Sequence, residues 1–341
     1  MKNQKENKIK IFCTKDWFIG SDQENTGYEL IDTGEGEKLE RFGKYTFVRP
    51  YEDAVWPKCA TSDVAQMWDK ADGKFWSSKV GAKAGWKMKN NRGESSIKKW
   101  EMEYKGIKFL AMPTPFRHLG FFPEQASHWD FIENKIRQAL KNEKNPAALA
   151  GSGSGHGQDF PHVSPSKFLN LFGYTGVASL FALRAGAEVT HVDASKQTLN
   201  WAKENQKLNT ELSEAPMRII EDDVMKFLER EIKRGNKYDA IIMDPPKFGR
   251  GPKGEIWKLE EMLPKLLSQV QKVLSDKPLF IILTSYATES SSLSLGYALE
   301  EMMKNFPEDR LRGDIEAGEL CVLEKSNGRI VSLANTAVWS R

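Results

Sequence analysis

Short apolar runs alternate with longer amphipathic stretches along the second half of the chain. Five runs predict β-strands, at 168–172, 188–192, 218–220, 238–243 and 279–284. Each is followed by a stretch with helical spacing, at 177–185, 195–208, 224–234, 257–274 and 293–306. Five consecutive strand and helix steps of this length predict a parallel sheet with helices on both faces.

The alternation ends in a different pattern. Two strand-like runs, 319–324 and 329–333, flank Ser326-Asn327-Gly328. Asn-Gly between two strands is typical of a tight hairpin, because both central turn positions need a positive φ. The pattern therefore predicts an α/β fold whose seven-stranded sheet finishes in an antiparallel hairpin.

The first 112 residues have short alternating runs and turn residues instead of long helical periods. Trp100, Met102 and Tyr104 alternate with glutamates, and Lys105-Gly106 separates them from a second apolar run. This pattern predicts a β-hairpin. We expect a small β-rich, tryptophan-rich domain at 1–112 in front of a larger domain at 113–341.

A helical stretch and a loop connect these two regions of different pattern. From Gln125 to Leu140, aromatic and aliphatic residues recur with helical spacing, as in a helix that packs on a core. Residues 146–166 are rich in Gly, Ser and Pro, which predicts a flexible loop. The two histidines in that loop are expected to be solvated.

The composition fits a globular protein, with 40% hydrophobic and 28% charged residues. The 341 residues contain no apolar run of about 18, so we expect no membrane span, and the N-terminus has no secretory signal pattern. Cys13, Cys59 and Cys321 lie far apart without metal-ligand spacing. This cysteine usage predicts no metal site and a reducing, cytoplasmic compartment.

A basic, aromatic stretch lies between Lys74 and Lys108. It holds ten Lys or Arg residues against three acids, with three tryptophans among them, although the net charge of the chain is only +3. Phosphates bind to such charges and bases stack on indoles, so Lys87, Lys89 and Arg92 are candidate RNA contacts. The alternative is a solvated charged face over a small tryptophan-filled core.

The first of the five strands runs into a glycine turn, Phe172-Gly173-Tyr174-Thr175-Gly176. Glycines let backbone N–H groups approach a ligand, and the helix that follows favours an anion at its N-terminus. A dinucleotide pyrophosphate needs a third glycine, so a carboxylate such as that of a methionine moiety is the better candidate. A tight turn without a ligand is the alternative.

Acidic residues follow the next two strands. Asp193 ends the second strand, where an acid can accept hydrogen bonds from both hydroxyls of a ribose, and Ala194-Ser195 lines the same edge. Asp222-Asp223-Val224 follows the third strand, where an acid can accept from an adenine amine. A helix N-cap is the alternative for this acid pair.

Asp244-Pro245-Pro246-Lys247-Phe248 ends the fourth strand. Proline holds the chain extended after Asp244, so its carboxylate and carbonyl are expected to point into the crevice beyond the strand ends. There they can hold an amine nucleophile or orient a base. Lys247 is a candidate phosphate contact and Phe248 a candidate stacking partner; a surface lysine and a core phenylalanine are the alternatives.

Together these segments resemble the catalytic domain of the bacterial large-subunit ribosomal RNA methyltransferases of the cytosine-C5 type. The resemblance covers 167–341, and its matching runs are 170–176, 191–195, 204–209, 222–224 and 243–248. Residues 120–125 are similar to the segment that this family places against its cofactor. The resemblance implies a class I, Rossmann-like methyltransferase fold with S-adenosylmethionine as cofactor. Gln125, the glycine turn, Asp193, Asp223 and Asp244 then surround the cofactor.

The chain departs from that family in two places. The first 100 or so residues do not look like the family's usual RNA-binding domain. Cytosine-C5 methylation also needs a cysteine thiolate that adds to the ring, which family members carry just after the fifth strand. Here Leu283 to Thr288 contains no cysteine. We therefore predict transfer to a nitrogen or oxygen atom without a cysteine intermediate.

The sequence favours RNA as the substrate, ribosomal RNA above all. Methylation of a protein or a small metabolite by the same core is one alternative. A non-catalytic RNA-binding protein that retains the cofactor fold is another. The missing third glycine and the C-terminal hairpin disfavour a nicotinamide dehydrogenase.

Overall fold

The computed structural model describes residues 9–17, 25–77, 84–89, 97–144, 164–250, 254, 256–286, 291–304, 306 and 313–341. The helices in these ranges are α1 (Ser62–Lys70), η1 (Pro123–Gln125), α2 (Ala126–Lys144), α3 (Val177–Arg184), α4 (Lys196–Leu208), η3 (Thr210–Leu212), α5 (Val224–Arg234), α6 (Leu259–Val273) and α7 (Ser292–Lys304). The strands up to β8 are β1 (Lys10–Cys13), β2 (Tyr28–Gly34), β3 (Glu37–Phe42), β4 (Tyr45–Pro50), β5 (Gly73–Ser77), β6 (Ala84–Met88), β7 (Trp100–Tyr104) and β8 (Ile107–Ala111). The later strands are β9 (Lys167–Leu171), β10 (Glu188–Asp193), β11 (Met217–Glu221), β12 (Ala240–Met243), β13 (Phe248–Arg250), β14 (Ile256–Lys258), β15 (Phe280–Ser285), β16 (Asp314–Leu323) and β17 (Ile330–Ser340).

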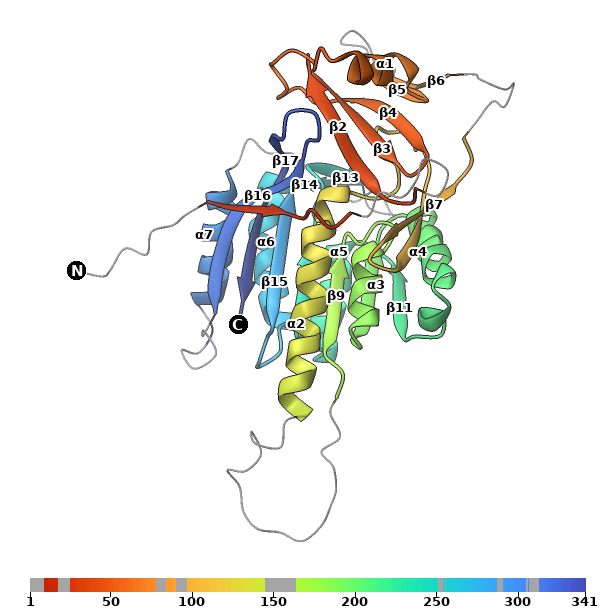
Figure 1. The fold of residues 1–341 in the computed structure, drawn as a ribbon. Helices are drawn as coiled ribbons and strands as arrows, with labels where there is room; N and C mark the ends of the chain where they lie inside the picture. The colour runs from red at the N-terminus through yellow and green to blue at the C-terminus, as the bar shows by residue number, and fades with distance from the viewer. Residues whose placement is uncertain are drawn as a thin grey trace, which may run out of the picture.

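The central sheet has the order β1-β16-β17-β15-β12-β9-β10-β11 (Figure 1). The five predicted parallel strands and the C-terminal antiparallel hairpin are confirmed, with Gly328 in the turn at φ 69°. The sheet has eight strands, not the predicted seven, because β1 lies parallel to β16. Gly318 makes this pairing possible, since a Cβ there would overlap the backbone of Lys10.

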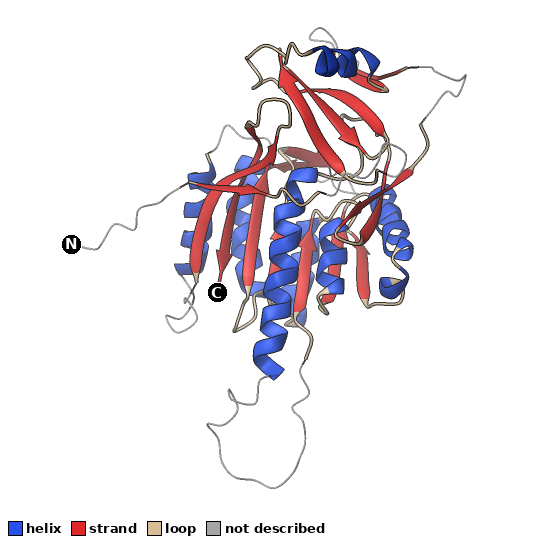
Figure 2. Ribbon diagram, viewed as in Figure 1, coloured by secondary structure: helices blue, strands red, loops and turns tan. Residues whose placement is uncertain are grey.

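Helices cover both faces of this sheet, as the alternating pattern predicts (Figure 2). Side chains of β9 alternate between the two sides. Phe168 packs in the cluster that includes Ile132 of α2 and Leu180 of α3. Its neighbour Leu169 packs in the cluster that includes Phe227 of α5 and further residues from α6 and α7. No helix within the described ranges is both long and apolar enough to cross a membrane.

A second sheet, β2-β3-β4-β5-β6, lies with α1 above the β16–β17 hairpin in Figure 1. The tip of that hairpin is hydrogen-bonded to β2, because Lys325 and Ser326 donate their backbone N–H groups to Leu30 and Ile31. The buried Glu324 carboxylate accepts from the backbone and the hydroxyl of Thr33 and from Arg329. The small sheet is therefore joined to the central sheet by buried polar contacts.

The predicted hairpin at 100–109 is confirmed as β7 and β8, with Lys105 and Gly106 at positive φ in the turn. Its β8 edge lies against α4. The Asn205 side chain accepts from the Leu110 N–H at 2.9 Å, and Asn209 both accepts from and donates to the Lys108 backbone. These two asparagines belong to the run 204–209 noted in the sequence, and their contacts here are structural.

Candidate active site

The glycine turn after β9 has an unusual backbone. Phe172, Tyr174 and Gly176 all have positive φ, at 59°, 52° and 82°. Gly176 is the N-cap of α3 and supplies no side-chain cap, so the first N–H groups of the helix have no side-chain acceptor from that residue. This arrangement fits a carboxylate ligand at the start of α3.

His191 supports the turn from behind. Its buried ring lies so close to Gly173 that a Cβ at that position would overlap it. The ring nitrogen Nδ1 is 3.0 Å from the Ser179 hydroxyl, which accepts from Asn170 at 3.0 Å. Burial lowers the pKa of His191, so the ring is neutral. The glycine at 173 is thus required by packing, whether or not a ligand binds.

Asp193 lies at the end of β10 with both carboxylate oxygens engaged. One accepts from the Tyr174 N–H at 2.9 Å. The other accepts from the Ser195 N–H at 2.9 Å and the Thr198 hydroxyl at 3.0 Å. The half-buried carboxylate therefore connects the glycine turn to the start of α4. The oxygen that accepts only from Tyr174 has a second lone pair and can accept further from a ribose hydroxyl.

The two acidic residues after β11, Asp222 and Asp223, have different roles. Asp223 is the N-cap of α5 and accepts from the Lys226 N–H at 3.0 Å, which is the structural alternative left open by the sequence. Asp222 forms an ion pair with Arg230 and accepts a hydrogen bond from the Asp223 N–H at 3.0 Å. Neither carboxylate is among the residues around the cavity at the glycine turn.

Asp244 ends β12, beside β9, and lines a cavity of about 60 Å³ together with the glycine turn. Phe121, Phe122 and Gln125 close this cavity from the segment before α2. Gln125 Nε2 lies 3.5 Å from Asp244 Oδ2 and donates to the Tyr286 hydroxyl at 3.1 Å. Desolvation is the main cause that raises the pKa of Asp244 well above its usual range, and the charge of Glu124 is the second. A carboxyl group with this environment is typical of functional sites.

A chain of hydrogen bonds fixes Gln125. Its Oε1 is 2.9 Å from Nδ1 of the buried His128, and His128 Nε2 is 3.2 Å from the Thr336 hydroxyl on β17. The Thr336 hydroxyl oxygen also lies 3.1 Å from the Leu283 carbonyl oxygen, so its single hydrogen has two possible acceptors. Burial lowers the pKa of His128 to about 3, so its ring is neutral and carries one N–H. The side chain beside Asp244 is thereby held by two strands of the sheet.

Comparison with known proteins agrees with this geometry. Residues 120–308 match the S-adenosylmethionine-dependent methyltransferase family. The crystal structure of a S-adenosylmethionine-dependent methyltransferase from Agrobacterium tumefaciens is 37% identical, with a TM-score of 0.78, over 97% of this chain and 93% of that one. The chain belongs to this family.

Ribosomal RNA enzymes are also similar to the methyltransferase, over shorter segments. The large-subunit methyltransferase I of Aeromonas salmonicida is 41% identical over 88 residues, which are 26% of this chain and 22% of that enzyme. The large-subunit methyltransferase K of Neisseria meningitidis is 35% identical over 149 residues, 42% of each chain. The methyltransferase thus spans less than half the length of these two relatives.

After Asp244 in the methyltransferase, Pro245 is buried and Pro246 to Phe248 are exposed. Pro246 accepts from the Trp257 indole at 2.6 Å, and Phe248 pairs with Lys258 in the β13–β14 hairpin. Phe248 is 56% exposed, so the alternative of a core phenylalanine is wrong. Lys247 is also exposed, beside the same hairpin.

Two tryptophans of the basic stretch, Trp86 and Trp100, make structural contacts within the protein. Trp100 is buried, stacks on Phe47 and donates to the Phe42 carbonyl at 3.1 Å, and Trp86 donates to the Thr114 carbonyl at 2.8 Å. The tryptophan-filled core is therefore present. Lysines 87 and 89 are exposed on β6 and just after it, while the predicted contact at 92 lies outside the described residues.

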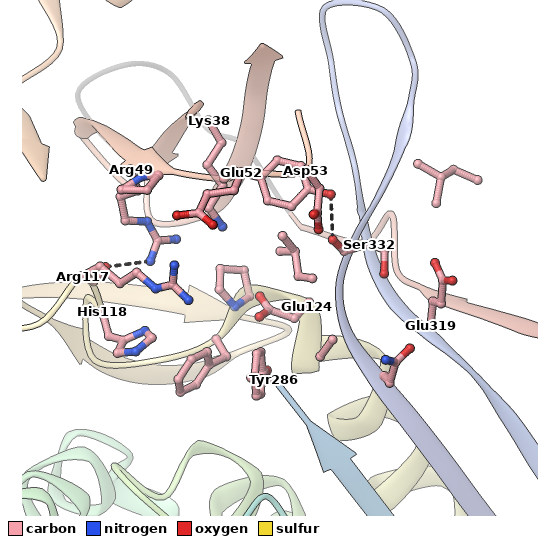
Figure 3. Close-up of a pocket in the computed structure, with 18 of the residues that line it drawn as sticks. Lys38, Arg49, Glu52, Asp53, Arg117, His118, Glu124, Tyr286, Glu319 and Ser332 are labelled. Carbon is pink, nitrogen blue, oxygen red and sulfur yellow. Dashed lines mark hydrogen bonds between the residues drawn. The ribbon is translucent and has the colours of Figure 1, made fainter. Parts of the chain in front are cut away.

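A larger cavity of about 750 Å³ opens between the small sheet, residues 117–124 and the β16–β17 hairpin (Figure 3). Sequence reasoning gave no role to its polar lining, which includes Arg49, Arg117, His118 and Glu124. Arg49 comes from β4 and the other three from residues 117–124, and only the fold brings these two segments together. Within the described ranges, no three His, Cys, Asp or Glu residues group as a metal site.

Proposed function

We propose that this methyltransferase transfers the methyl group of S-adenosylmethionine to a nitrogen or oxygen atom of RNA, ribosomal RNA above all, without a cysteine intermediate. The observation that carries the proposal is the meeting of Asp244 with the glycine turn, Gln125 and Tyr286 at adjacent strand ends. The names of the two ribosomal RNA relatives support the substrate class.

The residues of the cofactor site fit its chemical groups. In this proposal the start of α3 and the turn at 172–176 hold the methionine carboxylate, and Asp193 accepts from the ribose hydroxyls. Residues 222–224 face the adenine through backbone groups, since the Asp223 side chain caps α5. Gln125 and Asp244 lie at the end nearest the acceptor.

Bound S-adenosylmethionine supplies a methyl group on a positively charged sulfur. The acceptor lone pair forms the new bond to carbon, and the electrons of the broken sulfur–carbon bond stay on sulfur. Asp244 accepts a hydrogen bond from an acceptor amine and holds its lone pair toward the methyl carbon, with Gln125 beside the carboxyl group. The amine proton then passes to Asp244 or to water.

The N-terminal sheet and the exposed Lys87 and Lys89 contribute RNA contacts in this proposal. Phe248, exposed four residues after Asp244, stacks on a base, and Lys247 contacts a phosphate. Removing the positive charges at 87, 89 and 92 together then reduces the salt dependence of RNA binding.

The test is transfer of a radiolabelled methyl group to total RNA from a strain that lacks the gene, compared with RNA from its parent. Label is expected in RNA from the deletion strain, and mass spectrometry of the nucleosides identifies the modified atom. Label that enters protein or small molecules and leaves both RNA samples unmodified refutes the RNA assignment. Binding of S-adenosylmethionine without any transfer supports the non-catalytic alternative.

A further inference from the structure

The 750 Å³ cavity adjoins the cofactor site. Phe121 and Phe122 line both cavities. Tyr286, at the bottom of Figure 3, lines the larger one and accepts from Gln125, which reaches toward Asp244. The volume lies within the range of small-ligand pockets. A ligand in this cavity can therefore extend to the carboxyl group that we assign to the acceptor.

One end of the cavity is rich in positive charge. Arg49 donates from Nε and Nη2 to the two oxygens of Glu40, each at 2.6 Å, and Lys38 Nζ is 3.3 Å from the same carboxylate. Two buried cations thus contact one buried carboxylate, and the charge of the buried Glu124 also acts on both. Arg49 also donates to the Arg117 carbonyl at 3.0 Å, which places the exposed Arg117 beside them (Figure 3).

The local electrostatics agree with an excess of positive charge at this end. The pKa of His118 is lowered to about 3, mainly by burial and secondly by the charges of Arg49 and Arg117. The His118 ring is therefore neutral and adds no positive charge. Within the described part of the chain, no carboxylate forms an ion pair with Arg117. An anionic group of the ligand is the natural partner for this end.

The rest of the cavity has the opposite character. Asp53 and Glu319 line the side toward the β16–β17 hairpin, and Glu52 lies between Lys38 and Asp53 (Figure 3). The buried Glu124 lies on the floor beside Tyr286 (Figure 3). Such a cavity accepts one anionic group at one end and a neutral, hydrogen-bond-donating group at the other. A continuous run of phosphates through it meets repulsion from the acids.

We propose that the cavity binds a single nucleotide extruded from the RNA, with its phosphate at Arg49 and Arg117 and its base over Phe122 and Tyr286 beside Glu124. A base that carries an amine donor matches the Glu124 carboxyl, and aromatic side chains are usual partners for a splayed-out base. This inference rests on the proposed RNA substrate and adds the place where the acceptor nucleotide lies.

The experiment is calorimetry on the full chain with S-adenosylhomocysteine present. The probes are AMP, GMP, CMP and UMP, the four matching nucleosides, and inorganic phosphate. At least one monophosphate is expected to bind ten-fold or more tightly than its nucleoside. Arg117→Gln, at an exposed position, removes about ten-fold of that affinity and leaves the nucleoside and S-adenosylhomocysteine affinities unchanged. The matched control is Lys207→Gln on α4, also exposed, which changes none of them.

The outcomes separate this inference from the proposed function. RNA that is methylated with an unchanged KM by Arg117→Gln, or monophosphates that bind no better than nucleosides, overturns the pocket assignment and leaves the function standing. Monophosphate binding that depends on Arg117 without any RNA methylation refutes the function and keeps the pocket. Label that enters protein, with no monophosphate bound, assigns the cavity to a different acceptor and overturns the proposal.

Discussion

Asp193 ends β10 and Asp244 directly follows β12, but their carboxyl groups have very different hydrogen-bond partners. Asp193 accepts from three donors of the surrounding backbone and side chains. The one side-chain contact described for Asp244 is the 3.5 Å approach of Gln125. A tightly held acid suits a fixed ligand such as a ribose, whereas a loosely held one can reorient toward an acceptor.

Replacing Asp193 is expected to weaken cofactor binding. Asp193→Ala should reduce S-adenosylmethionine affinity by about 10²-fold, because charge-assisted hydrogen bonds to the ribose are lost and the turn loses its anchor at Tyr174. Calorimetry measures the affinity, and thermal denaturation checks the fold. Asp193→Asn, which keeps one acceptor oxygen, should lose less. A folded Asp193→Ala variant with normal affinity removes this residue from the site.

Asp244 should make stability depend on pH in a definite direction. Because its folded pKa is raised above the ordinary value of 3.8, the unfolded chain ionises first as the pH rises. This residue therefore lowers the free energy of unfolding progressively above pH 4. Asp244→Asn cannot ionise, so it should be more stable than the wild type at pH 8 and equal to it near pH 3.5. Urea denaturation at both pH values tests this, and a destabilised variant at pH 8 contradicts it.

Prediction from sequence worked for residues whose role is local. The glycine turn and the position of Asp193 follow from a strand that runs into a helix, and the structure has both. It failed for the lining of the large cavity, because Arg49, Arg117 and Glu124 have no shared motif and meet only in the folded chain. For Asp223 the capping alternative holds for the side chain, and any cofactor contact there stays a prediction.

At the scale of elements, helices were located well where caps mark their ends. The α5 limits match the prediction, with Asp223 as N-cap and Gly235 at positive φ after the last turn. α1 was missed; it is only nine residues long and none of its residues is fully buried, so no long apolar stripe marks it in the sequence. β1 was missed because a four-residue edge strand has too little pattern to reveal a distant partner.

The contact between the β16–β17 hairpin and β2 is expected to stabilise the fold through Glu324. Glu324→Ala should lower the free energy of unfolding by about 3 kcal/mol, because the buried N–H and hydroxyl of Thr33 lose their acceptor. Urea denaturation measures the change. The control is Glu316→Ala, which breaks an exposed ion pair with Lys10 and should cost less than about 1 kcal/mol. Equal losses in the two variants contradict a structural role for Glu324.

For the whole molecule, the three cysteines test the chemistry. Cys13 and Cys321 face each other in β1 and β16, and Cys59 lies in the small sheet's domain. Burial raises the pKa of the Cys321 thiol to about 12, which makes it a poor nucleophile. Replacing all three by serine should leave turnover within a few-fold.

Asp244→Ala is the contrasting variant and should lower turnover by about 10² or more, the scale of losing one positioned polar group. Methyl transfer to RNA is the measurement for both proteins, after the fold of each is checked. An inactive but folded triple serine variant, or a covalent adduct trapped with 5-fluorocytosine RNA, supports the cysteine mechanism instead.

Among the described strands, β1 is the earliest in the chain and among the last to be paired. Its residue Lys10 faces Gly318, so nearly the whole chain must be synthesised before the partner strand exists. At roughly 5–20 residues per second, that delay is about 15–60 s on the ribosome. During this delay, the backbone groups of the nascent β1 segment have no partner strand, and such an edge can pair with other chains. Closure of the sheet by β1 is thus a slow, late event, and it makes the sequence separation of these two strands a determinant of folding rate and of aggregation during synthesis.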